Sequence, residues 1–245
     1  MIKEPHKSSE FNNFASYAKE WWDPFGNYKI LHTLTPLRIK YIKSIFYDYS
    51  PNFKKTNKPF YNLDILDLGC GGGLVCEPLS RLGANITGID FVKQNIDIAK
   101  KHARDLNLNI KYLHQNLDTF KLTKKYDGIL ILEVLEHLDD WKKLIANIKN
   151  FLKPRGIIII STINRNLLAK VFAIYVAENI LKWTPKKTHT FEKFIKPKEL
   201  TSFLNKNKIN VIDVTGLVFK PISFEWYLDK NKHKINYFCT AVKSN

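Results

Sequence analysis

The chain has 245 residues, of which 44% are hydrophobic and 25% charged, as expected of a soluble globular protein with one large domain or two small ones. Its three cysteines have neither zinc-site nor disulfide-framework spacing, and the first residues lack the apolar core of a secretory signal, so we expect a reducing cytoplasm. The formal net charge is +16, but only five of the 39 basic residues are Arg, which weakens the case for a nucleic-acid reader.

The chain divides into an aromatic N-terminal part, which predicts helices over about the first sixty residues, and a part that alternates strands with helices. Near-continuous Ile and Leu runs predict strands buried on both faces of a parallel sheet, joined by right-handed crossovers. The predicted strands are 63–69, 85–90, 110–115, 126–132 and 156–162. The predicted helices between them are 73–83, 92–107 and 138–154. Two last runs, 208–219 and 235–243, have no helical pattern between them and predict an antiparallel pair.

A glycine-rich turn follows the first predicted strand. It contains three alternate glycines, Gly69, Gly71 and Gly73, and Asp67 precedes the first of them by two residues. Glycines allow a sharp turn and let a ligand approach the backbone closely. The dinucleotide fingerprint G-x-G-x-x-G fails here, because its sixth position holds Leu74 or Cys76, depending on the starting glycine. The spacing therefore excludes the usual dehydrogenase site.

The second predicted strand ends at Asp90, which lies 21 residues after Gly69. A carboxylate at that place can accept both ribose hydroxyls of a nucleoside, because ligands of open α/β sheets bind outside the carboxyl ends of the strands. The third strand ends near Gln115 and Asn116, whose amides could face an adenine. In the alternative, Asp90 only caps the next helix. The glycine turn favours the nucleoside site.

Together these segments resemble the class I S-adenosylmethionine-dependent methyltransferases. The likeness rests on LDLGCGGG, on GID, and on YDGILILEVLEHL followed by LKPRGIIIIST, where the family usually has Gly-Gly in place of Arg155–Gly156. Over about 11–237 the chain is similar to the ubiquinone-biosynthesis O-methyltransferases. That narrower likeness is carried by WWDPFGNYKILHTLTPLRIKYI, STINRN, THTFEKFIKPKEL and TGLVFKPI.

The resemblance implies a Rossmann-like α/β fold, with a mostly parallel seven-stranded sheet, a C-terminal antiparallel strand and helices on both faces. It implies one domain over 1–245, with an N-terminal helical cap at about 1–60 and a lid or membrane-contact insertion at about 164–196. The implied activity is O-methylation of polyprenylated phenols and catechols in ubiquinone synthesis, including both methylation steps. Other enzymes of that pathway are expected partners, and nucleic acid is not.

The resemblance also assigns S-adenosylmethionine as cofactor and points to residues that hold it. Those matching the family's positions are Arg38, Gly69, Asp90 and Leu132. We add Gly71, Gly73 and Gln115 from their places at the strand ends. A guanidinium such as that of Arg38 can clamp the methionine carboxylate of the cofactor through two hydrogen bonds. Alternatively, Arg38 is an ordinary surface residue of an amphipathic helix.

Methyl transfer to a phenol requires that a phenolate be generated or stabilised, by a base or by a metal. Glu133, Glu136 and His137 follow the fourth predicted strand and would share one face if a helix began there. The resemblance implies magnesium dependence, for which these three are the candidate ligands. Alternatively, the two glutamates only charge the start of the following helix. His189 is a further candidate base, and His32 and Asn164 are weaker candidates for the substrate side.

The most apolar long segment, 167–183, has 17 residues interrupted by Lys170, Glu178 and Lys182, whereas a membrane span needs about 20 apolar residues. As a helix it would carry two apolar stripes, and packing against the protein core would explain only one of them. Because it follows the fifth predicted strand, we predict a peripheral contact with an anionic membrane at the inner face, over the active site.

Two rival functions fit parts of the sequence. The basic charge favours an RNA methyltransferase, although a general drift of the sequence toward Lys also explains that charge. Against this rival, LEVLEH stands where methyltransferases acting on amino groups of bases usually have an Asn/Asp-Pro-Pro-aromatic motif. A non-catalytic lipid-binding module is the second rival. The intact glycine turn with Asp90 disfavours it, and titration with S-adenosylmethionine separates the two.

Overall fold

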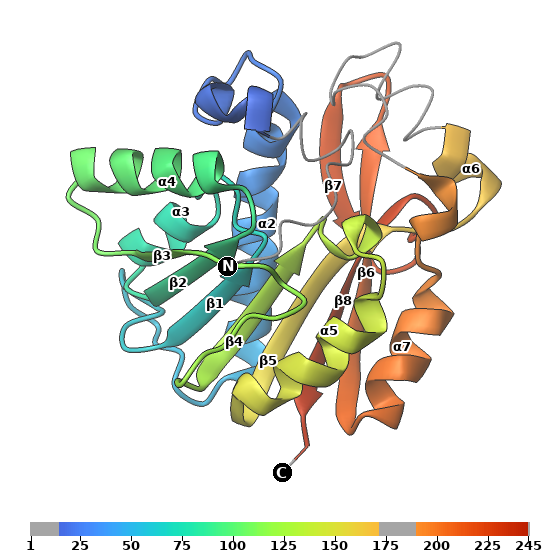
Figure 1. Cartoon of the computed structure of the whole chain (residues 1–245). Coiled ribbons are helices and arrows are strands. Elements are labelled where there is room, and N and C mark those ends of the chain that lie inside the picture. Colours follow the sequence, from blue (N-terminus) through green and yellow to red (C-terminus); the bar gives the residue numbers. More distant parts are fainter. Residues whose placement is uncertain (1–14, 172–189, 245) are drawn as a thin grey trace.

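The structure is a computed structural model that describes residues 15–171 and 190–244. The described residues form one eight-stranded sheet in the order β3-β2-β1-β4-β5-β8-β6-β7 (Figure 1). Strands β1 to β5 run parallel to one another, whereas β8 is antiparallel to both β5 and β6. The strands are β1 (Asp64–Leu68), β2 (Asn85–Asp90), β3 (Lys111–His114), β4 (Tyr126–Leu132), β5 (Leu152–Ile163), β6 (Ile209–Lys220), β7 (Glu225–Asp229) and β8 (Asn236–Lys243).

Helices cover both faces of this sheet, with α5 and α7 in front of it and α2 behind it in Figure 1. The α-helices are α2 (Lys29–Tyr49), α3 (Cys76–Arg81), α4 (Lys93–Asp105), α5 (Trp141–Ile148), α6 (Leu167–Lys170) and α7 (Pro197–Lys206). Short 3-10 helices are η1 (Ala18–Glu20), η2 (Leu135–His137), η3 (Lys149–Phe151) and η5 (Phe191–Lys193).

Each face of the sheet has its own apolar core. Helices α2, α3 and α4 pack on one face and α5 and α7 on the other. Because side chains alternate along a strand, Ile157 and Ile159 of β5 enter the first core, and Ile158 and Ile160 enter the second. A strand that supplies both cores must be apolar throughout, which is why the Ile and Leu runs predicted these strands.

The predicted fold class is confirmed, and the structure corrects the number of strands from seven to eight. The two C-terminal runs pair antiparallel as predicted, as β6 and β8. The additional strand, β7, forms a hairpin with β6 at the sheet edge. Its residues are exposed or half-buried, so it lacks the apolar pattern that reveals a buried strand.

The N-terminal part is helical as predicted, but α2 begins at Lys29 and continues through Pro36. Six of its seven buried residues belong to the first core: Ile30, Leu34, Tyr41, Ile42, Ile45 and Phe46. Apolar packing therefore holds the helix together across a proline that usually ends or kinks one.

Candidate cofactor-binding and active site

The glycine turn joins β1 to α3 at the carboxyl edge of the parallel strands. Gly69, Gly71 and Gly73 have φ angles of +74°, +52° and +92°, a region that side chains other than glycine rarely adopt. A Cβ atom at Gly69 would lie 2.4 Å from Val134 Cγ2, so the space is closed as well. The turn thus brings bare backbone to the edge where a ligand of this fold would lie.

Asp90 ends β2 beside this turn and is buried. Its carboxylate accepts hydrogen bonds from the backbone N–H of Gly71 (2.9 Å) and of Val92 (2.8 Å). Val92, not Asp90, is the N-cap of α4, so the capping alternative is not what the structure shows. Burial raises the pKa of the Asp90 carboxyl, and the two backbone hydrogen bonds act against this rise. The glycine turn and the second strand therefore meet at this carboxylate.

Trp21 covers the glycine turn, and sequence analysis missed it. A Cβ atom on Gly71 would lie 2.3 Å from Trp21 Cη2, and one on Gly72 would lie 2.5 Å from Trp21 Cγ. The indole Nε1–H donates to Asn95 Oδ1 at 2.8 Å, and the amide of Asn95 faces Asp90 Oδ1 at 3.4 Å. The N-terminal cap thus reaches the ribose-binding candidate through one side chain.

The neighbouring Trp22 makes a second contact with the turn. Its Nε1–H donates to the carbonyl oxygen of Gly72 at 3.1 Å, and its ring stacks on His102 with centroids 3.6 Å apart. His102 Nδ1 lies 2.6 Å from Glu77 Oε1, and Glu77 is fully buried in α3. The WW pair in the N-terminal block was the available signal, because a buried indole N–H needs a hydrogen-bond partner.

Arg38 is not a surface residue, because only 4% of it is exposed. Its Nη2 lies 3.6 Å from Glu133 Oε1, and neither Nε nor Nη2 has a hydrogen-bond partner among the described residues. Burial lowers the pKa of the guanidinium, while nearby carboxylates, Glu133 first, act against the fall. Buried donors of this kind suit an anionic ligand, so the site fits the carboxylate end of an amino acid.

Asp67, the acidic residue before the glycine turn, lies near Arg38 at the end of β1. It is buried and accepts a hydrogen bond from Cys76 Sγ at 3.2 Å. Burial raises the pKa of its carboxyl from the ordinary 3.8 to about 6, against the effect of the Cys76 hydrogen bond and of Arg38.

Two other predicted cofactor residues lie at the same edge. Leu132 is the last residue of β4 and is 8% exposed. Gln115 follows β3 and is half-buried, and its backbone N–H donates to the carbonyl oxygen of Asp90 at 3.1 Å. All the predicted cofactor residues therefore belong to the carboxyl edges of β1 to β4 or to α2, which packs over them.

The segment after β4 differs from the prediction. Glu133 has a φ of +56°, and only the single 3-10 turn η2 follows it, so no α-helix places Glu133, Glu136 and His137 on one face. Glu133 accepts hydrogen bonds from Ser161 Oγ at 2.7 Å and Asn236 Nδ2 at 3.3 Å. The backbone turn therefore directs the first glutamate toward β5 and β8.

The three side chains do not fit the predicted magnesium ion. Glu136 is buried and accepts a hydrogen bond from Thr162 Oγ1 at 2.9 Å. Across 15–171 and 190–244, no three His, Cys, Asp or Glu side chains are arranged to hold a metal. Magnesium needs several oxygen ligands converging on one point, and these carboxylates are instead engaged by hydroxyl and amide groups of the protein.

The remaining candidates divide into two groups. His189 lies outside the described residues. His32 Nε2 lies 2.8 Å from the carbonyl oxygen of Trp21, and Asn164 donates to the carbonyl oxygen of His233 at 2.9 Å. His32 thus anchors the N-terminal cap, and Asn164 fixes the end of β5.

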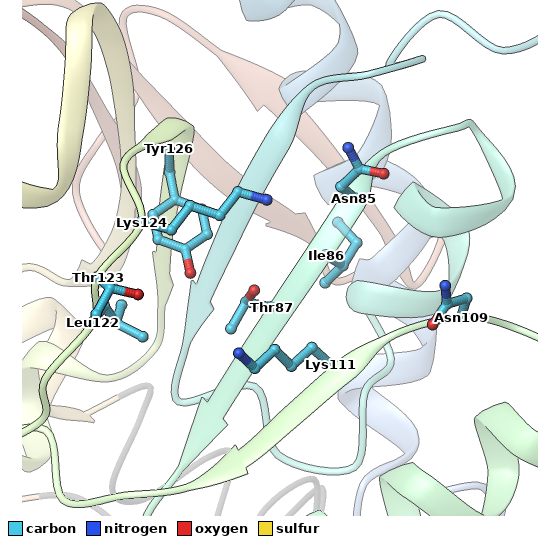
Figure 2. Close-up of a pocket in the computed structure, with 9 residues that line it drawn as sticks. All are labelled: Asn85, Ile86, Thr87, Asn109, Lys111, Leu122, Thr123, Lys124 and Tyr126. Atoms are coloured by element: carbon cyan, nitrogen blue, oxygen red, sulfur yellow. The ribbon is translucent and has the colours of Figure 1, made fainter.

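A surface pocket of about 260 Å³ lies at the opposite edge of the sheet (Figure 2). Asn85, Lys111 and Tyr126, which begin β2, β3 and β4, are among its lining residues. None of the predicted cofactor or catalytic residues lines it. It lies at the amino ends of the strands, where ligands of this fold do not bind.

Comparisons with known proteins agree with this geometry. A methyltransferase domain family matches residues 38–214. The chain is 42% identical to a "Ubiquinone biosynthesis O-methyltransferase" of Bartonella tribocorum over 238 residues, 96% of either chain. It is also 42% identical to the protein of that name from Pelagibacter ubique over 236 residues, 96% of this chain and 97% of the other.

Solved structures show the same fold. A magnesium protoporphyrin IX methyltransferase from Synechocystis with bound SAH superposes with a TM-score of 0.66 over 96% of either chain, at 18% identity. At that identity the likeness shows the fold alone.

Proposed function

The chain belongs to the ubiquinone biosynthesis O-methyltransferase family, and we propose that it transfers a methyl group from S-adenosylmethionine to the phenolic oxygen of a polyprenylated ubiquinone precursor. The observation that carries this proposal is the full-length match to relatives of that name. The site supports it, because a glycine turn, a buried carboxylate and a buried guanidinium lie along one sheet edge.

The residues at this edge would hold the two ends of S-adenosylmethionine. Asp90 is the proposed acceptor for the ribose hydroxyls, and Gln115 and Leu132 are proposed to face the adenine. Arg38 is proposed to bind the methionine carboxylate with the donors that lack a partner among the described residues. The backbone of the glycine turn, with Gly69, Gly71 and Gly73, is proposed to pass close beneath the cofactor. When bound, the cofactor supplies a methyl group already activated on sulfonium, so positioning does much of the catalytic work.

Four residues were predicted to help form the phenolate, as metal ligands or as a base, and the contacts of the two glutamates set those two apart. Ser161, Asn236 and Arg38 occupy positions around the Glu133 carboxylate where a proton would bind. Glu136 is buried and bonded to Thr162. We therefore assign both glutamates to positioning and retain His137, which is half-buried, and His189 as candidate bases.

Single substitutions test this assignment. His137→Asn and His189→Asn are compared at saturating S-adenosylmethionine. Loss of the true base should lower kcat by about 100- to 10,000-fold with an unchanged Kd for S-adenosylhomocysteine, while the other variant serves as control. Equal activity of both variants and the parent enzyme would contradict a histidine base.

The substrate class implies a membrane setting, and we propose that the enzyme docks on the inner face of an anionic membrane through 167–183. None of the helices in the described ranges combines the length and apolarity needed to cross a membrane. The described part of the segment is α6 with Val171 after it; Leu167 and Leu168 are 74% and 52% exposed, and Val171 is 49% exposed. Exposed apolar side chains close to lysines suit the boundary between lipid and water. The rest of 167–183, from 172 on, lies outside the described residues.

We further propose a single-domain organisation, with the N-terminal cap over the cofactor and the insertion at about 164–196 over the substrate. Both O-methylation steps are assigned to the same site, and association with other enzymes of the pathway is part of the proposal. Purified protein, S-adenosylmethionine and two short-prenyl substrates, a phenol and a catechol, test the steps. Methylation of both supports one enzyme for both steps, whereas methylation of neither contradicts the function.

A further inference from the structure

The exposed apolar side chains are unevenly distributed over the molecule. Ten large hydrophobic residues in the described ranges are exposed: Phe25, Tyr47, Tyr49, Tyr61, Leu106, Leu167, Leu168, Val171, Ile222 and Phe224. Three tyrosines and Leu106 lie at the amino ends of the parallel strands, because they end α2 and α4 or precede β1. Five of the others lie at the opposite edge, where the candidate site is, because they follow β5 or form the turn between β6 and β7: Leu167, Leu168, Val171, Ile222 and Phe224. Phe25 lies between η1 and α2, in the N-terminal cap.

The topology explains why the turn between β6 and β7 shares this edge. Both β5 and β6 are antiparallel to β8, so they run in the same direction and end at the same side of the sheet. Pairing of β8 with both strands begins at Asn236, opposite Ile163 and Leu217. Beyond Leu217, β6 pairs only with β7, as far as Lys220 opposite Glu225. The hairpin therefore projects about 10 Å past the end of β5 at its strand rise of about 3.4 Å per residue (Figure 1).

The tip of this hairpin carries two apolar side chains into solvent. Ile222 is 101% exposed and Phe224 is 63% exposed. Phe224 also has a φ of +53°, a conformation that disfavours a bulky residue. The ring of Phe224 packs edge-on against Phe219, with centroids 5.6 Å apart, but this contact leaves 63% of Phe224 exposed and covers nothing of Ile222. Packing within the chain therefore covers only a small part of the apolar tip.

Lysines lie beside the tip of the hairpin and at its base. Lys220 ends β6, and Lys230, Lys232 and Lys234 follow β7, whereas Glu225 and Asp229 are the acidic residues of the same stretch. All four lysines are exposed. An apolar tip with basic residues behind it complements the boundary of an anionic bilayer, where acyl chains lie beneath negative headgroups.

Hydrogen bonds connect this hairpin base to α6. Asn164 donates to the carbonyl oxygen of His233 at 2.9 Å, and Asn166 donates to that of Lys234 at 2.5 Å. Asn166 also accepts a hydrogen bond from the backbone N–H of Ala169 and so caps α6. The exposed α6 residues and the hairpin are thus held in a fixed relation to each other.

We propose that the β6–β7 hairpin tip is a second membrane anchor, in which Ile222 and Phe224 enter the interface of an anionic bilayer and the lysines of 220–234 contact its headgroups. This inference rests on the proposed function, since it names a second surface by which the same enzyme reaches a lipid substrate. Two anchors on one edge fix the orientation of the molecule, with the carboxyl ends of the strands toward the membrane.

The test compares Ile222→Ser/Phe224→Ser with the parent chain in flotation with vesicles of equimolar phosphatidylcholine and phosphatidylglycerol. The variant should bind about tenfold more weakly or worse, because two apolar side chains no longer enter lipid. Leu106→Ser/Tyr47→Ser, which removes exposed apolar groups from the opposite edge, should bind like the parent. Methylation of a water-soluble, short-prenyl catechol should be unchanged in the hairpin variant, which shows that it is folded.

Vesicle binding of the hairpin variant equal to that of the parent would overturn the inference. So would a parent dimer that the hairpin substitutions dissociate with no change in lipid binding, because the tip would then be a self-association surface. Failure of the parent to methylate any phenol, with vesicle binding still dependent on the hairpin, would contradict the proposed function and leave the anchor in place.

Discussion

Trp21→Phe tests how the N-terminal cap supports the proposed cofactor site. The substitution keeps an aromatic ring over the glycine turn and removes the Nε1–H that donates to Asn95 Oδ1 at 2.8 Å. Asn95 is 2% exposed, so its oxygen loses a partner in a place that water does not easily reach. Asn95 in turn donates to the Asp90 carboxylate proposed to hold the ribose, at 3.4 Å.

The expected loss of cofactor affinity in Trp21→Phe follows from these contacts. A buried acceptor left without its donor costs about 1–3 kcal/mol. Two shorter hydrogen bonds, from the backbone of Gly71 and Val92, still hold the Asp90 carboxylate. We therefore expect the loss of cofactor-binding free energy to lie in the lower part of this range. That corresponds to about a tenfold weaker Kd for S-adenosylhomocysteine, at about 1.4 kcal/mol per factor of ten.

Isothermal titration with S-adenosylhomocysteine measures this Kd for Trp21→Phe, Asn95→Ala and the double variant. Both single changes break the same hydrogen bond. The Kd of the double variant should therefore exceed that of the parent by less than the product of the two single-variant factors. Trp226→Phe, a matched change in β7 far along the sheet, should leave Kd unchanged. A Trp21→Phe variant with the parent Kd, or effects that multiply independently, would refute the connection from Trp21 to Asp90.

Three further predictions concern the same edge. Arg38→Met should weaken the binding of S-adenosylhomocysteine by about 100-fold, because a charge-assisted pair with the ligand carboxylate is lost. Binding of methylthioadenosine, which lacks that carboxylate, should be nearly unaffected. Equal losses of affinity for both ligands in titration would contradict the assigned contact. Gly71→Ala should lower Tm and cofactor affinity together, because a Cβ would lie 2.3 Å from Trp21 Cη2 at a φ of +52°; an unchanged Tm in calorimetry would show that the turn yields easily. Asp67→Asn tests the raised pKa. Folding raises the pKa of this carboxyl from 3.8 to about 6, so the stabilisation from its protonation is fully present below about pH 4 and is lost as the pH rises through about 6. The parent should therefore lose about 2 kcal/mol of unfolding free energy relative to the variant between pH 4 and pH 7 in urea titrations, and a constant difference would contradict the pKa.

The sequence predicted those parts of the structure that local pattern determines. Ile157–Ile160 had to serve two cores at once, and that requirement is visible as a continuous apolar run. Gly69, Gly71 and Gly73 could be recognised because their conformations exclude other residues. Asp90 follows from its place at a strand end, since parallel strands bring their carboxyl ends to one edge.

Contacts between distant parts of the chain were not predictable in this way. Trp21 bonds to a residue 74 positions away, and Trp22 to one 50 positions away, and no periodicity encodes those pairings. The expected helix face of Glu133, Glu136 and His137 failed because one residue with positive φ redirects the chain. Strand β7 was missed because a half-exposed edge strand needs no apolar pattern.

Methyl transfer from S-adenosylmethionine to a phenolic oxygen of a prenylated ring can be observed directly. The most direct measurement incubates the purified chain with S-adenosylmethionine carrying an isotopically labelled methyl group and a short-prenyl catechol, and locates the label by mass spectrometry and NMR. We expect the label on a ring oxygen, with S-adenosylhomocysteine formed in equal amount. Label on ring carbon, transfer to RNA in preference to the catechol, or binding of the cofactor without any transfer would contradict it.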